Sequence, residues 1–439
     1  MSVFYARQLD RYPVRSRRIW LLLMAVVATL VGSYEAQISP VLPLMLKDLH
    51  MSLPTYGLIA GLSVVVGAVA AGASGPLADR WGRVTLLIPA LLLTGICDLA
   101  MLLIRNPGEL LLLRAVLSFI EGFAATTTAG LVRDFSPRVG RATAFGFWTW
   151  GPVGANFMAA AIAGLTLPIF LTWQSQFLIM GITSIVLTVI VAFNIRDLSP
   201  ALRAKVIHTE AEGEALGTGT GEVKIGKVRE ILRHPHIWAH ALGMTSWLVL
   251  YETLVIYGPT MLVQSFHITA ASAATVMSYF WILNLGSLIV AGYISDRLRL
   301  RKPVSLFGGI CSTIVMAILI ARIGVASSAA EIGAIGAVLG MFLGVTYAPW
   351  MAMFSENLED IRPSLQATGW GLWGFCVRAM TVIMVIVAPL IVAATHGWQT
   401  WLIIATIFEA AYMPVILAFK GPWWRRSAVE RAPRPTVAS

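Results

Sequence analysis

The sequence GPLADRWGR occupies residues 75–83, directly after an apolar stretch, and a similar sequence, GYISDRLRLRK, occupies residues 292–302 after another. The two sequences lie 217 residues apart, and the same spacing separates Tyr34-Glu35 from Tyr251-Glu252, each inside an apolar stretch. The chain therefore consists of two similar halves. Internal repeats in membrane proteins usually place a binding site between the halves, near the middle of the bilayer.

The composition indicates a chain that lies in a membrane. Of its 439 residues, 57% are hydrophobic and only 12% are charged, whereas soluble proteins carry roughly 25% charged residues. A soluble domain has too little interior to bury this much apolar surface, so the bilayer is the expected solvent. The three cysteines, Cys97, Cys311 and Cys376, fall in apolar stretches and provide neither a disulfide framework nor a zinc site.

Stretches of about 20 apolar residues, the length that crosses ~30 Å of hydrocarbon, occur in two sets of six. The first set lies near residues 19–45, 56–76, 84–104, 109–132, 142–166 and 174–195, and the second near 238–263, 271–294, 303–321, 329–353, 364–394 and 398–419. This pattern predicts an all-α fold: a polytopic membrane protein with twelve transmembrane helices in two six-helix, pseudo-symmetric bundles. The sixth and twelfth stretches begin alike, with Trp173-Gln174 and Trp398-Gln399.

The net charge of +10 orients the chain and gives no reason to expect nucleic acid as a partner. Of the 32 Lys and Arg residues, only Lys47, Arg105 and Arg322 fall in loops on the side of the membrane opposite to the termini. By the positive-inside rule both termini are cytoplasmic, and we expect a cell-membrane protein, in the inner membrane where a cell has two. The predicted parts are a cytoplasmic N-terminal tail (1–18), an N-terminal six-helix bundle (19–195), a cytoplasmic linker (196–237), a C-terminal six-helix bundle (238–420) and a cytoplasmic C-terminal tail (421–439).

The sequence at 75–83 resembles the signature loop of the major facilitator superfamily, and the copy at 292–302 resembles its weaker second-half version. With twelve stretches and a long central linker, the resemblance covers nearly the whole chain. It implies a secondary transporter with spans one, four, seven and ten around a central cavity and spans two, five, eight and eleven beside them. Because the sequence contains no catalytic set and no nucleotide-binding motif, we expect neither enzyme activity nor a cofactor.

The signature loop also has a physical rationale. Gly75 permits close helix approach and Gly82 a tight turn, while Asp79 suits the positive end of a helix dipole. The resemblance assigns that dipole to span eleven and implies that Arg83 pairs with Asp134, which would latch the cytoplasmic side in the outward-open state. The alternative is a loop that only satisfies membrane topology. The predicted gating residues are Gly75, Asp79, Arg80, Gly82, Arg83, Asp134, Asp296 and Arg297.

Five charged residues fall inside spans that the resemblance places around the cavity, and ionisable residues in a bilayer are functional candidates because they are costly there. One interpretation is internal neutralisation, for example between Arg114 and Glu121, two turns apart on one helix. The other assigns proton transfer to the acids, since desolvation raises the proton affinity of a carboxylate, and carboxylate binding to the forked guanidinium groups. The proton-coupling candidates are Glu35, Glu252 and Glu121, and the substrate-binding candidates are Arg378, Arg114, Tyr34, Gln37, Tyr251, Asn156, Asn284 and Trp373.

The segment from Gly32 to Gln37 resembles the acidic first-helix motif of the aromatic-acid and metabolite proton symporters, although that motif has Asp where this chain has Gly32. We therefore predict proton-coupled symport of a small organic anion, a carboxylate with or without an aromatic ring, by a monomer. Its partners are the substrate, protons and the lipid bilayer. Gly151-Pro152-Val153-Gly154 favours an alternative, proton-coupled export of drugs or other hydrophobic or cationic compounds. A sensor that kept the fold without transport is a third hypothesis.

Two further acids, Asp98 in span three and Glu409 in span twelve, fall outside the predicted cavity, and we expect a structural hydrogen bond at each. His234, His236 and His240 have a spacing that a metal ion can use. Because no carboxylate lies suitably near them in the sequence, we expect an interfacial cluster and no metal site.

Overall fold

The computed structural model describes residues 7–33, 35–136, 146–203, 205, 233–361 and 366–424. This part is helical, as the apolar stretches predict, apart from one pair of short parallel strands, β1 (Gln8–Leu9) and β2 (Asp197–Leu198). Most of the predicted linker lies outside the described residues.

The helices follow the two predicted sets. The first half contains α1 (Arg15–Gly32), α2 (Glu35–Ile38), η1 (Ser39–Val41), α3 (Leu42–Asp48), α4 (Leu53–Trp81), α5 (Arg83–Ala100), η2 (Met101–Leu103), α6 (Pro107–Phe135), α8 (Trp150–Phe170) and α9 (Trp173–Asn194). The second half contains α12 (Pro235–Phe266), α13 (Ala270–Leu298), α14 (Arg301–Ala321), α15 (Ala329–Ile361), α16 (Gln366–Ala394), α17 (Gln399–Ala410), α18 (Tyr412–Val415) and η4 (Ile416–Ala418). Among the described residues, 11 helices are long and apolar enough to cross a bilayer, and counting the pair Arg15–Gly32 and Ala36–Asp48, bent by 56°, as one span gives 12.

Three of the long helices begin at side chains that bond their own first turn. The backbone N–H of Thr55 donates to Ser52 Oγ before α4 (3.2 Å), and that of Ser272 donates to Thr269 Oγ1 before α13 (3.1 Å). Before α6, the N–H of Glu109 donates to Asn106 Oδ1 (3.0 Å). Such caps satisfy backbone donors that have no partner within the helix, so these short polar residues fix where the spans start.

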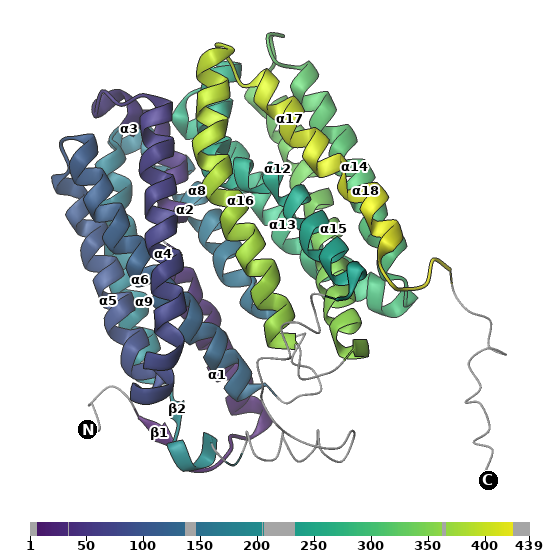
Figure 1. Cartoon of the computed structure of the whole chain (residues 1–439). Coiled ribbons are helices and arrows are strands. Elements are labelled where there is room, and N and C mark those ends of the chain that lie inside the picture. The colour runs from purple at the N-terminus through teal and green to yellow at the C-terminus, as the bar shows by residue number, and fades with distance from the viewer. Residues whose placement is uncertain are drawn as a thin grey trace.

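The spans alternate in direction, so their ends form two faces (Figure 1). We call the face where α1 begins and the described chain ends the terminal face, and the other the opposite face. At the opposite face, the tryptophan of the repeated Trp-Gln pair donates a hydrogen bond to the end of another helix in each half. Trp173 Nε1 donates to Asp48 Oδ2 at the end of α3, and Trp398 Nε1 donates to Gln264 Oε1 near the end of α12, both at 2.7 Å.

Close packing inside the first half depends on glycine. A Cβ at Gly122 of α6 would lie 2.5 Å from the carbonyl oxygen of Gly67 in α4, and one at Gly151 of α8 would lie 2.6 Å from Thr29 Cβ in α1. Both distances are too short for any side chain, so these helix pairs approach as closely as backbone contact allows. The Gly-Pro sequence at 151–154 therefore has a packing role in span five.

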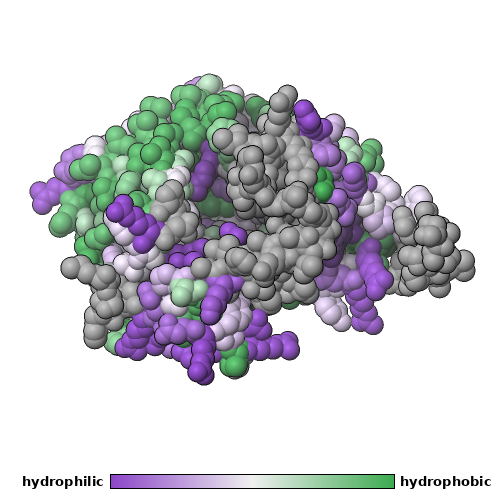
Figure 2. All heavy atoms as spheres, turned by 60° about the horizontal axis from the view of Figure 1, so that its bottom comes forward, coloured by the Kyte–Doolittle hydropathy of each residue, from purple (hydrophilic) through white to green (hydrophobic). Residues whose placement is uncertain are grey.

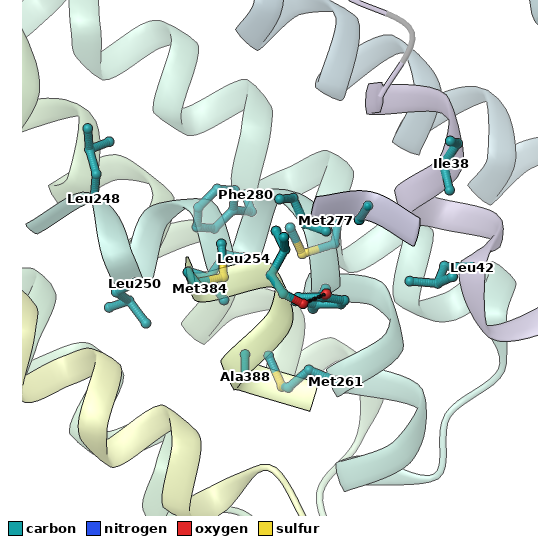
Figure 3. Close-up of a cluster of buried hydrophobic side chains, with 14 of the residues drawn as sticks. Ile38, Leu42, Leu248, Leu250, Leu254, Met261, Met277, Phe280, Met384 and Ala388 are labelled. Atoms are coloured by element: carbon teal, nitrogen blue, oxygen red, sulfur yellow. Dashed lines mark hydrogen bonds between the residues drawn. The ribbon is translucent and has the colours of Figure 1, made fainter. Parts of the chain in front are cut away.

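The two halves meet near the opposite face. A Cβ at Gly57 of α4 would lie 2.4 Å from the carbonyl oxygen of Val385 in α16, and Tyr257 Oη of α12 donates to that same oxygen at 2.7 Å. Ser39 Oγ of η1 donates to the carbonyl oxygen of Val255 at 2.6 Å. Ile38 and Leu42 belong to one buried cluster with residues of the second half (Figure 3). The opposite face is therefore closed between the halves.

Toward the terminal face the same two helices separate. Gly57, Gly61 and Gly72 follow one stripe of α4, and Gly374 lies on the stripe of α16 that carries Val385. A Cβ at Gly61 would lie 2.8 Å from Ile386, whereas a Cβ at Gly72 or Gly374 would meet nothing within 4 Å. Figure 2, which brings the terminal face forward, shows a hollow in it. Among the residues that the structure describes, the halves are therefore apart at the terminal face and in contact at the opposite one.

Candidate functional site

A cavity of about 180 Å³ lies at the level where α4 and α16 begin to separate. Two of its walls, α4 and α6, belong to the first half, and the third, α16, belongs to the second. Its lining residues come from the middle of each helix, so the cavity lies between the halves at mid-membrane depth. The lining residues are Val64, Gly67, Ser118, Glu121, Gly122, Ala125, Arg378 and Thr381.

Two of the predicted charges, Glu121 and Arg378, face this cavity from different halves. Arg378 forms no hydrogen bond or ion pair with any residue that the structure describes. Glu121, in contrast, interacts with another group of the protein. A guanidinium at mid-membrane is stable only when water or a counter-charge solvates it. The cavity therefore offers a fixed positive charge and an acid to whatever enters it.

Arg114 lies elsewhere. It is 2% exposed, it is not among the lining residues, and its Nη1 donates to Tyr56 Oη at 2.7 Å with the guanidinium carbon 5.2 Å from the centre of the Tyr56 ring. Tyr56 in turn packs edge-on against Tyr257 of the second half, with ring centroids 6.1 Å apart. In this conformation Arg114 is part of the contact between the halves near the opposite face.

The second half carries a continuous column of aromatic rings through α12, α15 and α16. Trp247 stacks on Tyr251 and on Tyr347, with centroids 5.5 Å and 6.0 Å apart, and Trp350 continues the column toward Trp373 at 5.2 Å. Trp247 and Trp350 are buried, whereas Tyr251, Tyr347 and Trp373 are only partly covered. Glu252 interacts electrostatically with Tyr347. Two predicted substrate residues, Tyr251 and Trp373, thus belong to one aromatic column.

The predicted amides mainly hold the protein together. Asn284 is buried, accepts from Tyr251 Oη (3.3 Å) and donates to the carbonyl oxygen of Gly340 (2.9 Å), so it positions Tyr251. Asn156 Nδ2 donates to the carbonyl oxygen of Pro152 in its own helix (3.1 Å).

Gln37 is buried too, and its Nε2 donates to Asp98 Oδ2 at 3.1 Å. Ser184 Oγ donates to the same carboxylate oxygen at 3.4 Å, and Ser312 Oγ donates to Glu409 Oε1 in the second half. Asp98 and Glu409 therefore have the structural hydrogen bonds expected for acids outside the cavity.

Four of the predicted residues fall wholly or partly on parts that are not described. Tyr34 lies outside the described residues, and so do the side chains of Glu35 and Asp79 and the surroundings of Gly75. The backbone of Glu35 begins α2, directly after the bend between α1 and the rest of the first span. Of the histidines, His240 is buried and stacks on Phe419 with centroids 3.7 Å apart.

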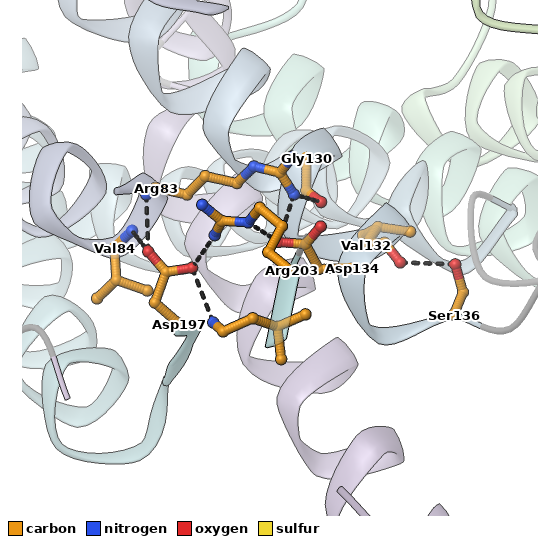
Figure 4. A network of polar contacts seen from close by, with 9 residues as sticks. Arg83, Val84, Gly130, Val132, Asp134, Ser136, Asp197 and Arg203 are labelled. Atoms are coloured by element: carbon orange, nitrogen blue, oxygen red, sulfur yellow. Dashed lines mark hydrogen bonds and ion pairs between the residues drawn. The ribbon is translucent and has the colours of Figure 1, made fainter. Parts of the chain in front are cut away.

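A buried ion-pair network lies at the terminal face of the first half (Figure 4). Arg83 Nη1 contacts Asp134 Oδ2 at 2.6 Å, and Arg203 Nε contacts the same oxygen at 3.2 Å. Asp197, the first residue of β2, pairs with Arg203 and accepts from the backbone N–H of Arg83 at 2.8 Å. Gly82, with φ 93°, makes the turn that brings Arg83 into this position. We call Arg83, Asp134, Asp197 and Arg203 the first-half network.

The second half has a counterpart, of which the sequence analysis predicted Asp296 but missed Arg301 and Glu356. Arg301, the first residue of α14, pairs with Asp296 at the end of α13 and contacts Glu356 Oε1 near the end of α15 at 2.9 Å. Arg301 is the first residue of α14, as Arg83 is the first residue of α5. The two arginines lie 218 residues apart, one residue more than the spacing of the repeat. We call these three residues the second-half network. The predicted Arg80 and Arg297 are exposed.

Comparison with known proteins identifies the family. The family model of the Major Facilitator Superfamily matches residues 21–383. The glucose transporter GlcP of Staphylococcus epidermidis is 23% identical over 90% of this chain and 92% of its own, and the 4-hydroxybenzoate transporter PcaK of Pseudomonas aeruginosa is 23% identical over 65% and 68%. The multidrug resistance protein MdtG of Yersinia enterocolitica is 33% identical over 31% and 34%.

A solved structure shares the fold. The crystal structure of a D-xylose-proton symporter aligns with a TM-score of 0.70 at 13% identity and covers 91% of this chain and 96% of that one. The family model spans both halves and the cavity between them. The chain therefore belongs to the Major Facilitator Superfamily of membrane transporters.

Proposed function

We propose that the chain carries a small organic carboxylate together with a proton by alternating access, and that the described conformation is open toward the cytoplasm. The observation that carries this proposal is the cavity in which Arg378 of the second half lies without a partner, among the described residues, while Glu121 of the first half lines the other side. The termini on the open side are cytoplasmic by the positive-inside rule.

Charge balance explains why proton and substrate would move together. An empty cavity with ionised Glu121 and cationic Arg378 has no net charge from this pair, and neither has a cavity that holds a carboxylate and a protonated Glu121. A carboxylate without the proton leaves one negative charge, and a proton without the carboxylate leaves one positive charge. Closing a cavity around an unpaired charge is costly in a low dielectric, so only the two neutral states are expected to occlude and cross.

Glu35 and Glu252 remain the other proposed proton carriers. Glu35 begins α2 beside the bend in the first span, and Glu252 lies near the middle of α12 beside the aromatic column. Either can take the proton in the same charge balance. Substituting the three acids one at a time distinguishes them, since only the carrier couples transport to a pH gradient.

The size of the cavity and the aromatic column of the second half favour a small substrate with a ring. Its volume of about 180 Å³ is below the roughly 300–1,000 Å³ of pockets for drug-sized ligands. The partly covered rings of Tyr251, Tyr347 and Trp373 offer stacking surfaces. The similarity to a 4-hydroxybenzoate transporter makes an aromatic carboxylate the first probe to use.

The ion-pair networks would act as gates. Each network lies within one half in the open conformation, so neither joins the halves on the terminal face. We expect the start of α16 to approach the loop at residues 75–83 when that face closes, with Gly75, Asp79 and Arg80 at the contact and Asp296 and Arg297 acting in the second half. A ligand drives this change only through different affinities for the two conformations.

The test is counterflow of labelled 4-hydroxybenzoate in proteoliposomes. Losing the charged hydrogen bonds of Arg378 is expected to weaken exchange by about 10–100-fold in Arg378→Ala, with partial recovery in Arg378→Lys. Arg299→Ala, which removes an exposed arginine far from the cavity, is the matched control. The acid that carries the proton keeps exchange but loses uptake driven by a pH gradient when it is changed to Gln.

Three results would contradict the proposal. If uptake by the unmodified protein does not depend on the pH gradient, transport is not coupled to protons. If Arg378→Ala exchanges 4-hydroxybenzoate as fast as the unmodified protein, Arg378 does not bind the substrate. If the protein exchanges glucose and not 4-hydroxybenzoate, the substrate is not a carboxylate.

The second candidate is proton-coupled export of hydrophobic or cationic compounds. The aromatic column favours it, because the faces of Trp and Tyr attract cations, and so does the similarity of part of the chain to MdtG. If proteoliposomes extrude a cationic dye and do not exchange 4-hydroxybenzoate, the second function is the correct one.

A further inference from the structure

The strand pair at the terminal face places like charges side by side. In the parallel pair of β1 and β2, Gln8 lies opposite Asp197, and the backbone N–H of Asp197 donates to the carbonyl oxygen of Arg7 at 3.0 Å. Arg7 and Arg196 directly precede these residues on adjacent strands. Like charges in neighbouring positions of paired strands repel each other, so this register needs a counter-charge.

A third arginine adds to the same cluster. Arg17 lies in the first turn of α1, just before Trp20. Trp20 Nε1 donates to Asn194 Oδ1, two residues before Arg196 (3.3 Å), so the start of α1 lies beside Arg196. In keeping with this arrangement, the pKa of Arg196 is lowered by its partial burial and by the charges of Arg7 and Arg17. Arg196 donates to the carbonyl oxygens of Phe193 and Ile195 at the end of α9 (2.8 Å and 2.6 Å). We call Arg7, Arg17 and Arg196 the arginine cluster.

Within the described residues the cluster has no acidic partner. Arg7 and Arg17 are exposed, and neither forms an ion pair or a side-chain hydrogen bond there. Asp10, the nearest acid in the sequence, forms no ion pair with them, and Asp197 already bonds Arg203 and the backbone of Arg83. The part of the chain that the structure describes therefore leaves this positive charge available to a ligand.

The surface beside the cluster faces hydrocarbon. Ile19 and Trp20 at the start of α1 and Phe193 near the end of α9 are 59%, 47% and 58% exposed, and Trp20 Nε1 donates to Asn194 Oδ1 at 3.3 Å. Tryptophan with one polar contact and an exposed ring is typical of the membrane interface. Cationic groups thus lie at headgroup level, directly above an apolar surface that acyl chains cover.

We propose that the arginine cluster binds the phosphate of an anionic phospholipid whose acyl chains lie along α1 and α9. Guanidinium groups bind phosphate through paired hydrogen bonds, and the negative charge offsets the repulsion between the two strands. Because β2 also carries Asp197 of the first-half network, the bound lipid holds β1 and β2 together over the Arg83–Asp134 pair.

Native mass spectrometry of the full-length protein in detergent tests this site. Phosphatidylglycerol is expected to bind more tightly than phosphatidylcholine to the unmodified chain. The double variant Arg7→Gln/Arg17→Gln should lose about 5-fold in phosphatidylglycerol affinity for each arginine removed. Neither side chain bonds the described protein, so the variant is expected to fold normally, which a melting curve without lipid checks.

The control variant is Arg105→Gln/Arg299→Gln, which removes two exposed arginines elsewhere. It should keep the preference for phosphatidylglycerol. Equal loss in both double variants would show a general charge effect and overturn the site, as would unchanged binding in Arg7→Gln/Arg17→Gln. Thermal stabilisation by inorganic phosphate as large as that by phosphatidylglycerol would overturn the assignment to a lipid.

Discussion

Each half of the molecule pairs an arginine at the start of one span with an acid at the end of the next, but the surroundings of the two pairs differ. In the first half, the side chain of Asp134 is 7% exposed, because Arg203 and Asp197 cover the Arg83–Asp134 pair. In the second half, the side chain of Glu356, the partner of Arg301, is 53% exposed.

The segments that follow the two six-span sets explain the difference. After α9 the chain forms β2 and returns over the first-half network. After η4 the chain instead docks on buried Lys302, whose Nζ donates to the carbonyl oxygen of Phe419 at 2.8 Å. Asp296 and Glu356, the two acids that Arg301 contacts, stay largely exposed. The same repeated motif therefore forms a buried ion-pair network in the first half and one with exposed acids in the second.

The largest expected effect is that of Asp134→Ala. Removing the acid leaves Arg83 and Arg203 buried without their shared partner, which is expected to cost about 3–5 kcal/mol of folding free energy. Glu356→Ala removes an acid from the exposed network and is expected to cost at most about 1 kcal/mol. Unfolding curves of both variants in detergent measure the contrast, and equal losses would show that burial does not distinguish the networks.

A second comparison sets the closed face against the open one. Gly57→Val would place its side chain against the backbone of α16 at Val385, where the halves meet, and is expected to cost about 1–3 kcal/mol through overpacking. Gly374→Leu enters open space in the described conformation, so we expect little change in stability. It is nevertheless expected to abolish transport, because α16 must approach the first half when the terminal face closes.

Melting temperatures and counterflow rates together check this prediction. Gly371→Ala, a small addition where a Cβ would also meet nothing within 4 Å, serves as the control. Normal transport by Gly374→Leu would mean that the stripe of α16 does not close against α4. A large stability loss in that variant would mean that the space is already filled.

The repeat in the sequence predicted the fold because span length and hydrophobicity are local properties of the chain. The family resemblance located Arg83 and Asp134, but the repeat did not lead to Arg301 and Glu356, since the strict spacing of 217 residues falls on Leu300 and Met351. Asp197 and Arg203 were missed for another reason. They lie in a polar segment, and only the strand pairing shows which of its charges return to the bundle.

The sequence indicated which charges lie in the middle of the spans, but it did not show which of them face the cavity, since Arg114 bonds Tyr56 outside it. Glu121 and Arg378 face the cavity because mid-span charges must face polar space. Gln37 lies close in sequence to Glu35 but bonds Asp98, away from the cavity. The bend between α1 and α2 changes the direction of the helix, so a helical wheel drawn through it gives the wrong face.

The repeated tryptophans give a third comparison. Trp173 donates to the carboxylate of Asp48, whereas Trp398 donates to the neutral amide of Gln264, at the same distance of 2.7 Å. Hydrogen bonds to charged groups contribute about 1.5–3 kcal/mol, and neutral ones about 0.5–1.5 kcal/mol. Trp173→Phe should therefore destabilise more than Trp398→Phe in denaturant unfolding, and the reverse order would show that ring packing and not the indole bond decides.

The smallest expected effect separates the acids outside the cavity from those inside it. Asp98→Asn and Glu409→Gln each keep an oxygen that accepts from Ser184 or Ser312, so we expect less than about 1 kcal/mol of destabilisation. Neither should change the dependence of uptake on a pH gradient, whereas the same isosteric change at the coupling acid among Glu35, Glu121 and Glu252 should remove it. Loss of coupling in Asp98→Asn would move the proton path to the junction of α2, α5 and α9, because Gln37 of α2 and Ser184 of α9 hold the carboxylate of Asp98 there.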